Sequence, residues 1–82
     1  MTSLLTRTII AVLKDHRHTC RLTHERESLP AQRITGLVRE RIPTARHNVV
    51  TAELYRLVEK GQLRELREPR LPTRFALPKR QP

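Results

Sequence analysis

The chain has 82 residues, of which 17 are lysine or arginine and 8 are aspartate or glutamate, so its formal net charge is +9. This length supports one small hydrophobic core and excludes two. No apolar run approaches the ~18 residues of a membrane span, and the longest, residues 9–13, is too short for the core of a signal peptide. The single cysteine excludes an internal disulfide. We therefore expect a cytoplasmic protein without membrane contact.

The excess of positive charge favours a polyanionic partner. Lysine and arginine side chains that neutralise phosphates release condensed counterions, and this release drives binding. Most of the basic residues are arginines, whose planar guanidinium groups can grip a phosphate or a guanine edge. Solubility alone would also account for the charge, but a nucleic acid is the partner that the composition favours.

The chain begins with a segment of helical periodicity. Apolar residues at helical spacing predict a first helix over residues 3–16. They are Leu5, Ile9, Val12 and Leu13. The polar stretch that follows alternates over residues 19–23, which predicts a short strand, and residues 23–27 could add a helical turn.

A second helix is predicted to start at residues 29–30. Pro30 suits a first helical position, and Ser28 is the candidate cap. Pro43 ends the helix, because the residue before a proline avoids the helical conformation. The apolar stripe of this helix consists of Ile34, Leu37, Val38 and Ile42.

A third helix is predicted from Thr44, as its cap, to Lys60, and Gly61 is its stop signal. Its inner stripe is Val50, Leu54, Leu57 and Val58. The opposite face carries Ala45, Asn48, Ala52 and Tyr55. Only residues 42–44 separate the second helix from the third, which is the short connection of a helix-turn-helix.

The pattern becomes extended after Gly61. Residues 62–67 and 73–77 read as short strands on either side of a proline-bearing basic turn, residues 68–72. Together they predict a β-hairpin. Residues 78–82 contain two prolines and two basic residues, and we expect a disordered basic tail there.

Two short segments carry a resemblance to a known family. They are ELYRLVEKGQL, residues 53–63, and RFAL, residues 74–77. In this context the chain resembles the winged helix-turn-helix family over about residues 4–77, and we expect residues 1–77 to form one such domain. The resemblance implies an α+β domain in which three helices are followed by a two-stranded β-hairpin wing.

The resemblance also implies a function. A chain of this family binds double-stranded DNA without catalysis, as a transcriptional regulator of bacterial or phage type. The recognition helix, residues 44–60, would enter the major groove, and the wing, residues 62–77, would lie on the backbone. Many members act as homodimers, for which Leu4 or Ile10 of the first helix would be free.

The residues expected to contact DNA follow from this arrangement. Asn48 can pair bidentately with adenine and Arg46 with guanine, and Arg70 lies at the tip of the wing. His47 could instead pack against the second helix. The complete set is Arg33, Thr44, Arg46, His47, Asn48, Thr51, Arg56, Arg67, Arg70 and Arg74.

Other interpretations stay open. Zinc-type ligands gather at His16, His18, Cys20 and His24, although their spacing matches no common zinc motif. A module that docks on an acidic protein partner would need an exposed apolar patch, for which Leu66 and Leu71 are the spare residues. We expect no enzymatic activity and no cofactor, because two glycines cannot build a glycine-rich phosphate loop and no carboxylate pair lies in an apolar context.

Overall fold

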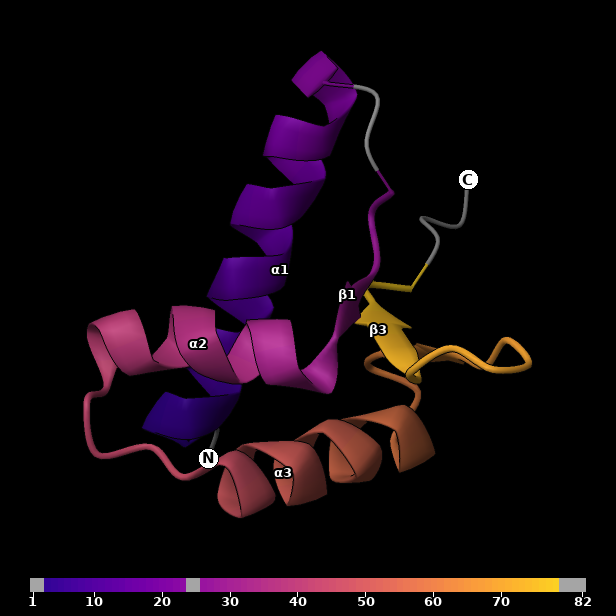
Figure 1. Cartoon of the computed structure of the whole chain (residues 1–82). Coiled ribbons are helices and arrows are strands. Elements are labelled where there is room, and N and C mark those ends of the chain that lie inside the picture. Colours follow the sequence, from indigo (N-terminus) through magenta and orange to yellow (C-terminus); the bar gives the residue numbers. More distant parts are fainter. Residues whose placement is uncertain (1–2, 24–25, 79–82) are drawn as a thin grey trace.

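A computed structural model describes residues 3–23 and 26–78. Over these residues the chain is a small α+β domain with three helices and a three-stranded antiparallel sheet (Figure 1). The elements are α1 (Leu4–Thr23), β1 (Leu29–Pro30), α2 (Ala31–Arg41), α3 (His47–Glu59), β2 (Arg64–Leu66) and β3 (Arg74–Ala76). No helix of this described part is long and apolar enough to cross a membrane.

The first helix is longer than the sequence indicates. α1 continues to Thr23, so the strand expected over residues 19–23 is wrong. Cys20 lies two helical turns after Leu13, and both side chains are buried, so the inner face of the helix continues through this polar segment. Residues 24–25 of the expected helical turn lie outside the described part of the chain, and residues 26–27 are not helical.

The segment before α2 is a strand rather than a helix start. Leu29 pairs with Phe75 and Pro30 with Arg74, so β1 joins the hairpin and the strand order is β1-β3-β2. The two-stranded sheet expected from the sequence is therefore wrong: within the described residues a third strand completes it. α2 begins at Ala31, and Ser28 accepts a hydrogen bond from Arg74 instead of capping the helix.

The helix-turn-helix connection spans residues 42–46 rather than 42–44. The backbone N–H of Ala45 donates to the carbonyl of Ile42 at 3.0 Å, and α3 begins at His47, so Thr44 is not its cap. Ala45 is buried in this connection and does not lie on the outer face of α3. The predicted stop is confirmed: Gly61 has a φ of 75°, and its N–H donates to the carbonyl of Val58.

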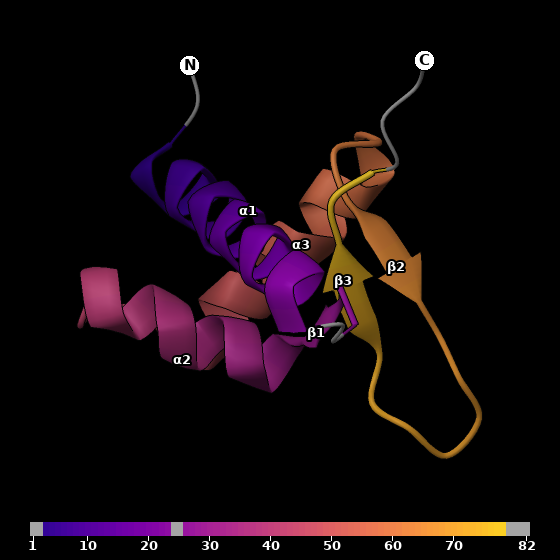
Figure 2. The same ribbon diagram turned by 90° about the horizontal axis from the view of Figure 1, so that it is seen from above.

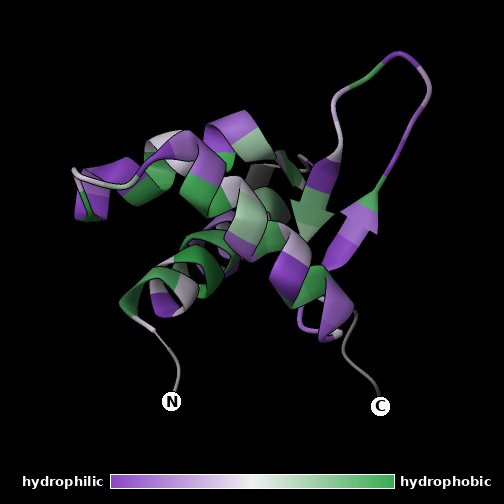
Figure 3. Cartoon of the chain, turned by 90° about the horizontal axis from the view of Figure 1, so that it is seen from below, coloured by the Kyte–Doolittle hydropathy of each residue, from purple (hydrophilic) through white to green (hydrophobic). Residues whose placement is uncertain are grey.

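The predicted hairpin is confirmed with shorter strands. β2 and β3 pair from Arg64 opposite Ala76 to Leu66 opposite Arg74. Figures 2 and 3 show the connecting loop, residues 67–73, projecting beyond the body of the domain. Arg70 in this loop has a φ of 65°, the left-handed conformation that side chains other than glycine adopt at a cost of roughly 1 kcal/mol.

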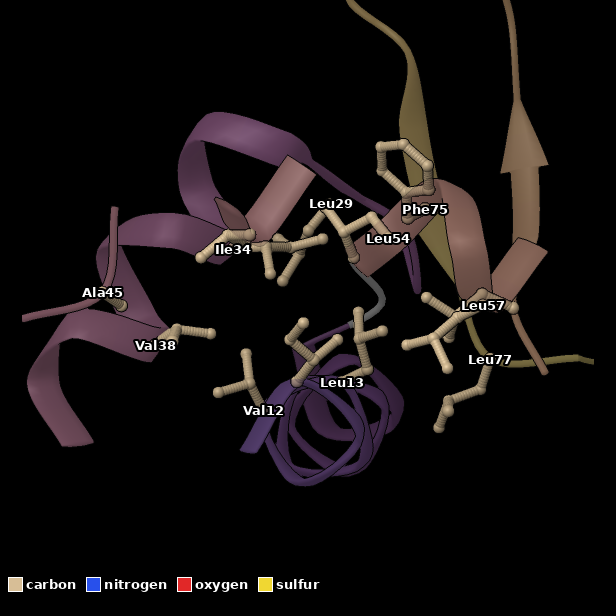
Figure 4. Close-up of a cluster of buried hydrophobic side chains, with 13 residues drawn as sticks. Val12, Leu13, Leu29, Ile34, Val38, Ala45, Leu54, Leu57, Phe75 and Leu77 are labelled. Carbon is tan, nitrogen blue, oxygen red and sulfur yellow. The ribbon is translucent and has the colours of Figure 1, made fainter. Parts of the chain in front are cut away.

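The core lies where the helices meet the inner face of the sheet. Figure 4 shows buried side chains from α1, α2, α3 and the strands converging there. The largest fully buried ones are Phe75, Ile9, Leu13, Ile34, Leu54, Leu57, Val38 and Val50. The inner stripe of α3 therefore holds the helix in place, and its opposite face is left for solvent or a partner.

Candidate nucleic-acid interface

The first turns of α3 present polar side chains without protein partners. Arg46, at the N-cap position, and Asn48 are both exposed. Among the described residues neither side chain takes part in a hydrogen bond or an ion pair. Val49 beside them is 48% exposed. The sequence placed Arg46 and Asn48 at this surface correctly, whereas Val49 was missed because nothing in the pattern shows that this side of α3 is open.

His47 is tied to α2. Its Nδ1 lies 2.8 Å from Oγ1 of Thr35, and that hydroxyl donates to the carbonyl of Ala31 at 3.0 Å. Because the single hydroxyl proton is used there, Nδ1–H of His47 is the donor to Thr35. The expectation that His47 packs against the second helix is confirmed, while its ring stays exposed.

The two threonines of this region have different roles. Thr44 is exposed in the connection before α3 and caps no helix. Thr51 donates its hydroxyl to the carbonyl of His47 at 2.8 Å, so its proton is used inside the helix and its methyl group remains for apolar contact.

The C-terminal half of α3 is engaged with the rest of the domain. Nε of Arg56 donates to Oε1 of Glu53 at 2.9 Å, and Thr6 of α1 donates to the same carboxylate at 2.9 Å. The hydrogen bond from Arg56 is the main cause that lowers the pKa of Glu53 below its usual 4.5. The ring of Tyr55 meets that of Phe75 edge to face, with centroids 5.4 Å apart. Arg56 therefore serves to hold α3 against α1.

The wing arginines differ in how they are bound. Arg67 donates to Glu65 at 2.5 Å, and this bond raises the pKa of Arg67. Arg74 is half-buried and donates to Oγ and to the carbonyl of Ser28, at 2.9 and 2.5 Å. Arg70 is exposed at the tip and, within the described residues, has no partner. The predicted backbone clamp thus has one free guanidinium and two that are held.

Arg33 is not brought beside α3. It lines a hollow of about 750 Å³ between α1 and α2, together with Leu37 and Arg41 on the same face of α2. Arg39 is the better placed residue, since it lies four positions after Thr35 and so shares the face of α2 that meets His47. The four-residue spacing could have indicated Arg39, but only the contact between Thr35 and His47 shows which face adjoins α3.

The potential zinc ligands do not converge. Residues 16–20 are helical, which places His16 and Cys20 together, with Nε2 and Sγ 3.2 Å apart. His18 lies exposed on another side of the helix, and His24 lies outside the described residues. Within the part of the chain that the structure describes, no group of three or more ligating side chains could hold a metal ion.

The exposed apolar residues agree only in part with those expected from the sequence. Leu71 is 54% exposed as expected, whereas Leu66 is half-buried. Among the large apolar residues whose burial is described, Leu4 is the most exposed, at 69%. It lies at the start of α1, where a free apolar side chain was expected for dimer contacts. Leu4 and Val49 line one apolar hollow.

Comparison with known proteins yields no relative: the chain matches no family model, no curated protein and no solved structure. The function is therefore inferred from the geometry and charge of the chain.

Proposed function

We propose that this chain is a winged helix-turn-helix protein that binds double-stranded DNA as a non-enzymatic transcriptional regulator in the cytoplasm. The observation that carries the proposal is the pair of free side chains at the start of α3. Arg46 and Asn48 have no partners among the described residues, and they lie on a helix whose opposite face is buried. They lie at the start of α3, directly after the turn that joins α2 to α3, where a recognition helix contacts base edges.

The outer face of α3 suits the major groove. That groove is wide enough for one α-helix and presents a distinct pattern of donors and acceptors for each base pair. The Asn48 amide can both donate to and accept from adenine, and the Arg46 guanidinium can donate twice to guanine. Val49 and the Thr51 methyl group add apolar surface for the methyl group of thymine.

The hairpin and α2 supply contacts to the backbone. The loop between β2 and β3 projects from the domain (Figure 2). It carries the exposed Arg70, whose cation can reach a phosphate beyond the groove that α3 occupies. Arg39 offers a second cation on the α2 side. Contacts of this kind fix the orientation of the protein and carry no sequence information.

The topology supports the same proposal. β1 lies between α1 and α2 in the chain and pairs with β3, so the sheet anchors the hairpin next to the helix-turn-helix. Arg74 strengthens the anchor through its two hydrogen bonds to Ser28. The loop therefore extends from a fixed base.

A fluorescence anisotropy titration tests the proposal. A labelled duplex of mixed sequence is titrated with the protein at several salt concentrations, and circular dichroism confirms that the protein is folded. We expect micromolar binding that weakens steeply with salt, because bound phosphates release counterions. A folded protein that does not bind duplex DNA at low salt would exclude the proposal.

A further inference from the structure

An apolar groove lies beside the proposed DNA surface. It has a volume of about 490 Å³ and lies between the start of α1, the helix-turn-helix connection and the start of α3. Its lining includes Leu4, Leu5, Ile42, Ala45, Arg46 and Val49. Ala45 is buried and Leu5 and Ile42 are half-buried, while Leu4 and Val49 stand exposed at 69% and 48%. The groove thus has an apolar base between two exposed apolar side chains.

The charge around this groove is positive. Arg46 lines it and has no partner in the described part of the chain. Arg7 is exposed and lies about one turn after Leu4 on α1. No carboxylate of the described residues lines the groove. Glu53, one turn after Val49 on α3, is already neutralised by Arg56. An occupant with acidic side chains would therefore be favoured.

We propose that this groove binds an acidic amphipathic helix of a protein partner. Such a helix would insert apolar side chains between Leu4 and Val49, at the spacing of successive turns, and would set its acidic residues against Arg7 and Arg46. A second copy of this chain fits less well. A two-fold contact through the same groove would bring the Arg7 and Arg46 side chains of both copies together around one apolar contact.

The groove shares residues with the proposed DNA surface, and this part of the inference rests on the proposed function. Arg46 and Val49 line the groove and also belong to the first turns of α3. A helix seated there would cover both side chains and exclude duplex DNA from α3. Binding of the acidic helix and of DNA is therefore mutually exclusive, which makes the partner an inhibitor of DNA binding.

A designed peptide serves as the probe. It has about 18 residues, which is long enough to gain some helicity, with leucines at positions i, i+4, i+7 and i+11, a few glutamates beside them, alanines elsewhere and a fluorescent label. Anisotropy is measured without DNA on the full chain. Two control peptides replace every glutamate by lysine or every leucine by serine. We expect the acidic leucine peptide to bind and both controls to bind at least about tenfold more weakly.

Matched protein variants locate the binding. Leu4→Ser removes one apolar wall, and Val49→Ser removes the other. Each should weaken peptide binding about tenfold, as loss of a largely buried aliphatic contact does. Leu71→Ser is the control, since Leu71 is comparably exposed but lies on the hairpin loop. Equal peptide affinity for the Leu4→Ser and Leu71→Ser proteins would overturn the proposal.

Two further outcomes are decisive. Sedimentation of the chain alone should show a monomer, whereas a dimer that Leu4→Ser abolishes would make a second copy the occupant. The unlabelled peptide should displace duplex DNA from the parent protein, while Leu4→Ser keeps the DNA affinity and loses the displacement. If the chain binds the peptide but not DNA, the groove still binds an acidic helix, and the proposed function is refuted. Simultaneous binding of DNA and peptide would refute the exclusion.

Discussion

The two halves of α3 differ in what their side chains do. In the N-terminal half, Arg46 and Asn48 have no partner in the described residues, and Val49 is half exposed. In the C-terminal half, Glu53 and Arg56 form an ion pair that Thr6 joins, and the Tyr55 ring packs on Phe75. The exposed side chains of Arg46, Asn48 and Val49 are therefore free to bind, whereas the contacts of the C-terminal half hold the helix in place.

This difference shows how a small domain can position a binding surface. A short chain buries a modest core, so polar contacts at one end of the helix help to fix its direction. The N-terminal end of the helix then presents exposed side chains in fixed positions, and these side chains are not needed for contacts within the domain. The arginines alone would not separate the halves, because Arg46 stands at the N-cap of the first half and Arg56 lies in the second.

The inner stripe of α3 carries the largest expected effect, since both halves depend on it. Leu54 is fully buried, so Leu54→Ala should lower the free energy of unfolding by about 2–5 kcal/mol. Val49→Ala, a truncation on the outer surface, should cost less than about 1 kcal/mol. Urea denaturation followed by circular dichroism measures both. Similar losses for the two variants would place the core on the wrong face of α3.

Asn48 tests whether the free half recognises bases. After selection of a preferred duplex, Asn48→Ala should reduce the discrimination between that duplex and a mutated one by about 1–3 kcal/mol, since a bidentate amide contact is lost. The free energy of unfolding should stay within about 0.5 kcal/mol of the parent value. Anisotropy titrations of both duplexes give the ratio. If the Asn48→Ala variant discriminates between the two duplexes as well as the parent does, Asn48 does not contact a base.

Arg70 extends the comparison to the hairpin, which also has a free and a held arginine. Arg70→Ala should weaken binding to all duplexes about equally and reduce the slope of log affinity against log salt by about 0.9. Arg67→Ala should change the slope less, because Arg67 is paired with Glu65. Salt titrations of DNA binding by the two variants measure both slopes. Identical slopes would show that the pairing of Arg67 with Glu65 does not affect its contact with DNA.

A variant of Glu53 has the smallest expected effect. It tests how much the ion pair in the C-terminal half of α3 contributes to the free energy of unfolding. The pKa of folded Glu53 is lowered from 4.5, so its ion pair stabilises the fold above that pH and the benefit is lost as the pH falls through the lowered value. Glu53→Gln should therefore cost up to about 1 kcal/mol at pH 7 and less near pH 3. Urea titrations at both pH values measure this. Glu59→Gln, at an exposed residue without a described partner, is the control and should cost nothing at either pH.

The sequence predicted those parts of the fold that depend on local signals. Helical periodicity located the inner stripe of α3, Gly61 marked its end, and the alternation around Phe75 indicated the hairpin. β1 was not predictable, because two residues form a strand only by pairing with β3, far along the chain. The end of α1 was missed because residues 19–23 alternate in polarity as a strand does.

The candidate site was predictable only where one helix defines it. Arg46 and Asn48 follow from the position of the inner stripe of α3. The choice between Arg33 and Arg39 depends on which face of α2 meets α3, and periodicity does not say this. The apolar groove joins Leu4 to Val49, which are 45 positions apart in the sequence, so it exists only in the folded chain.

The most direct test of the account is a salt-dependent DNA titration of three proteins: the parent, Arg46→Gln and Arg56→Gln. Each variant removes one positive charge, from the N-cap of α3 or from its C-terminal half, but only Arg46 has no partner among the described residues. We predict that Arg46→Gln weakens binding to duplex DNA several-fold and lowers the salt slope by about 0.9, whereas Arg56→Gln keeps the parent slope. Equal losses in the two variants, or no binding by the folded parent, would contradict the assignment of DNA binding to the N-terminal half of α3.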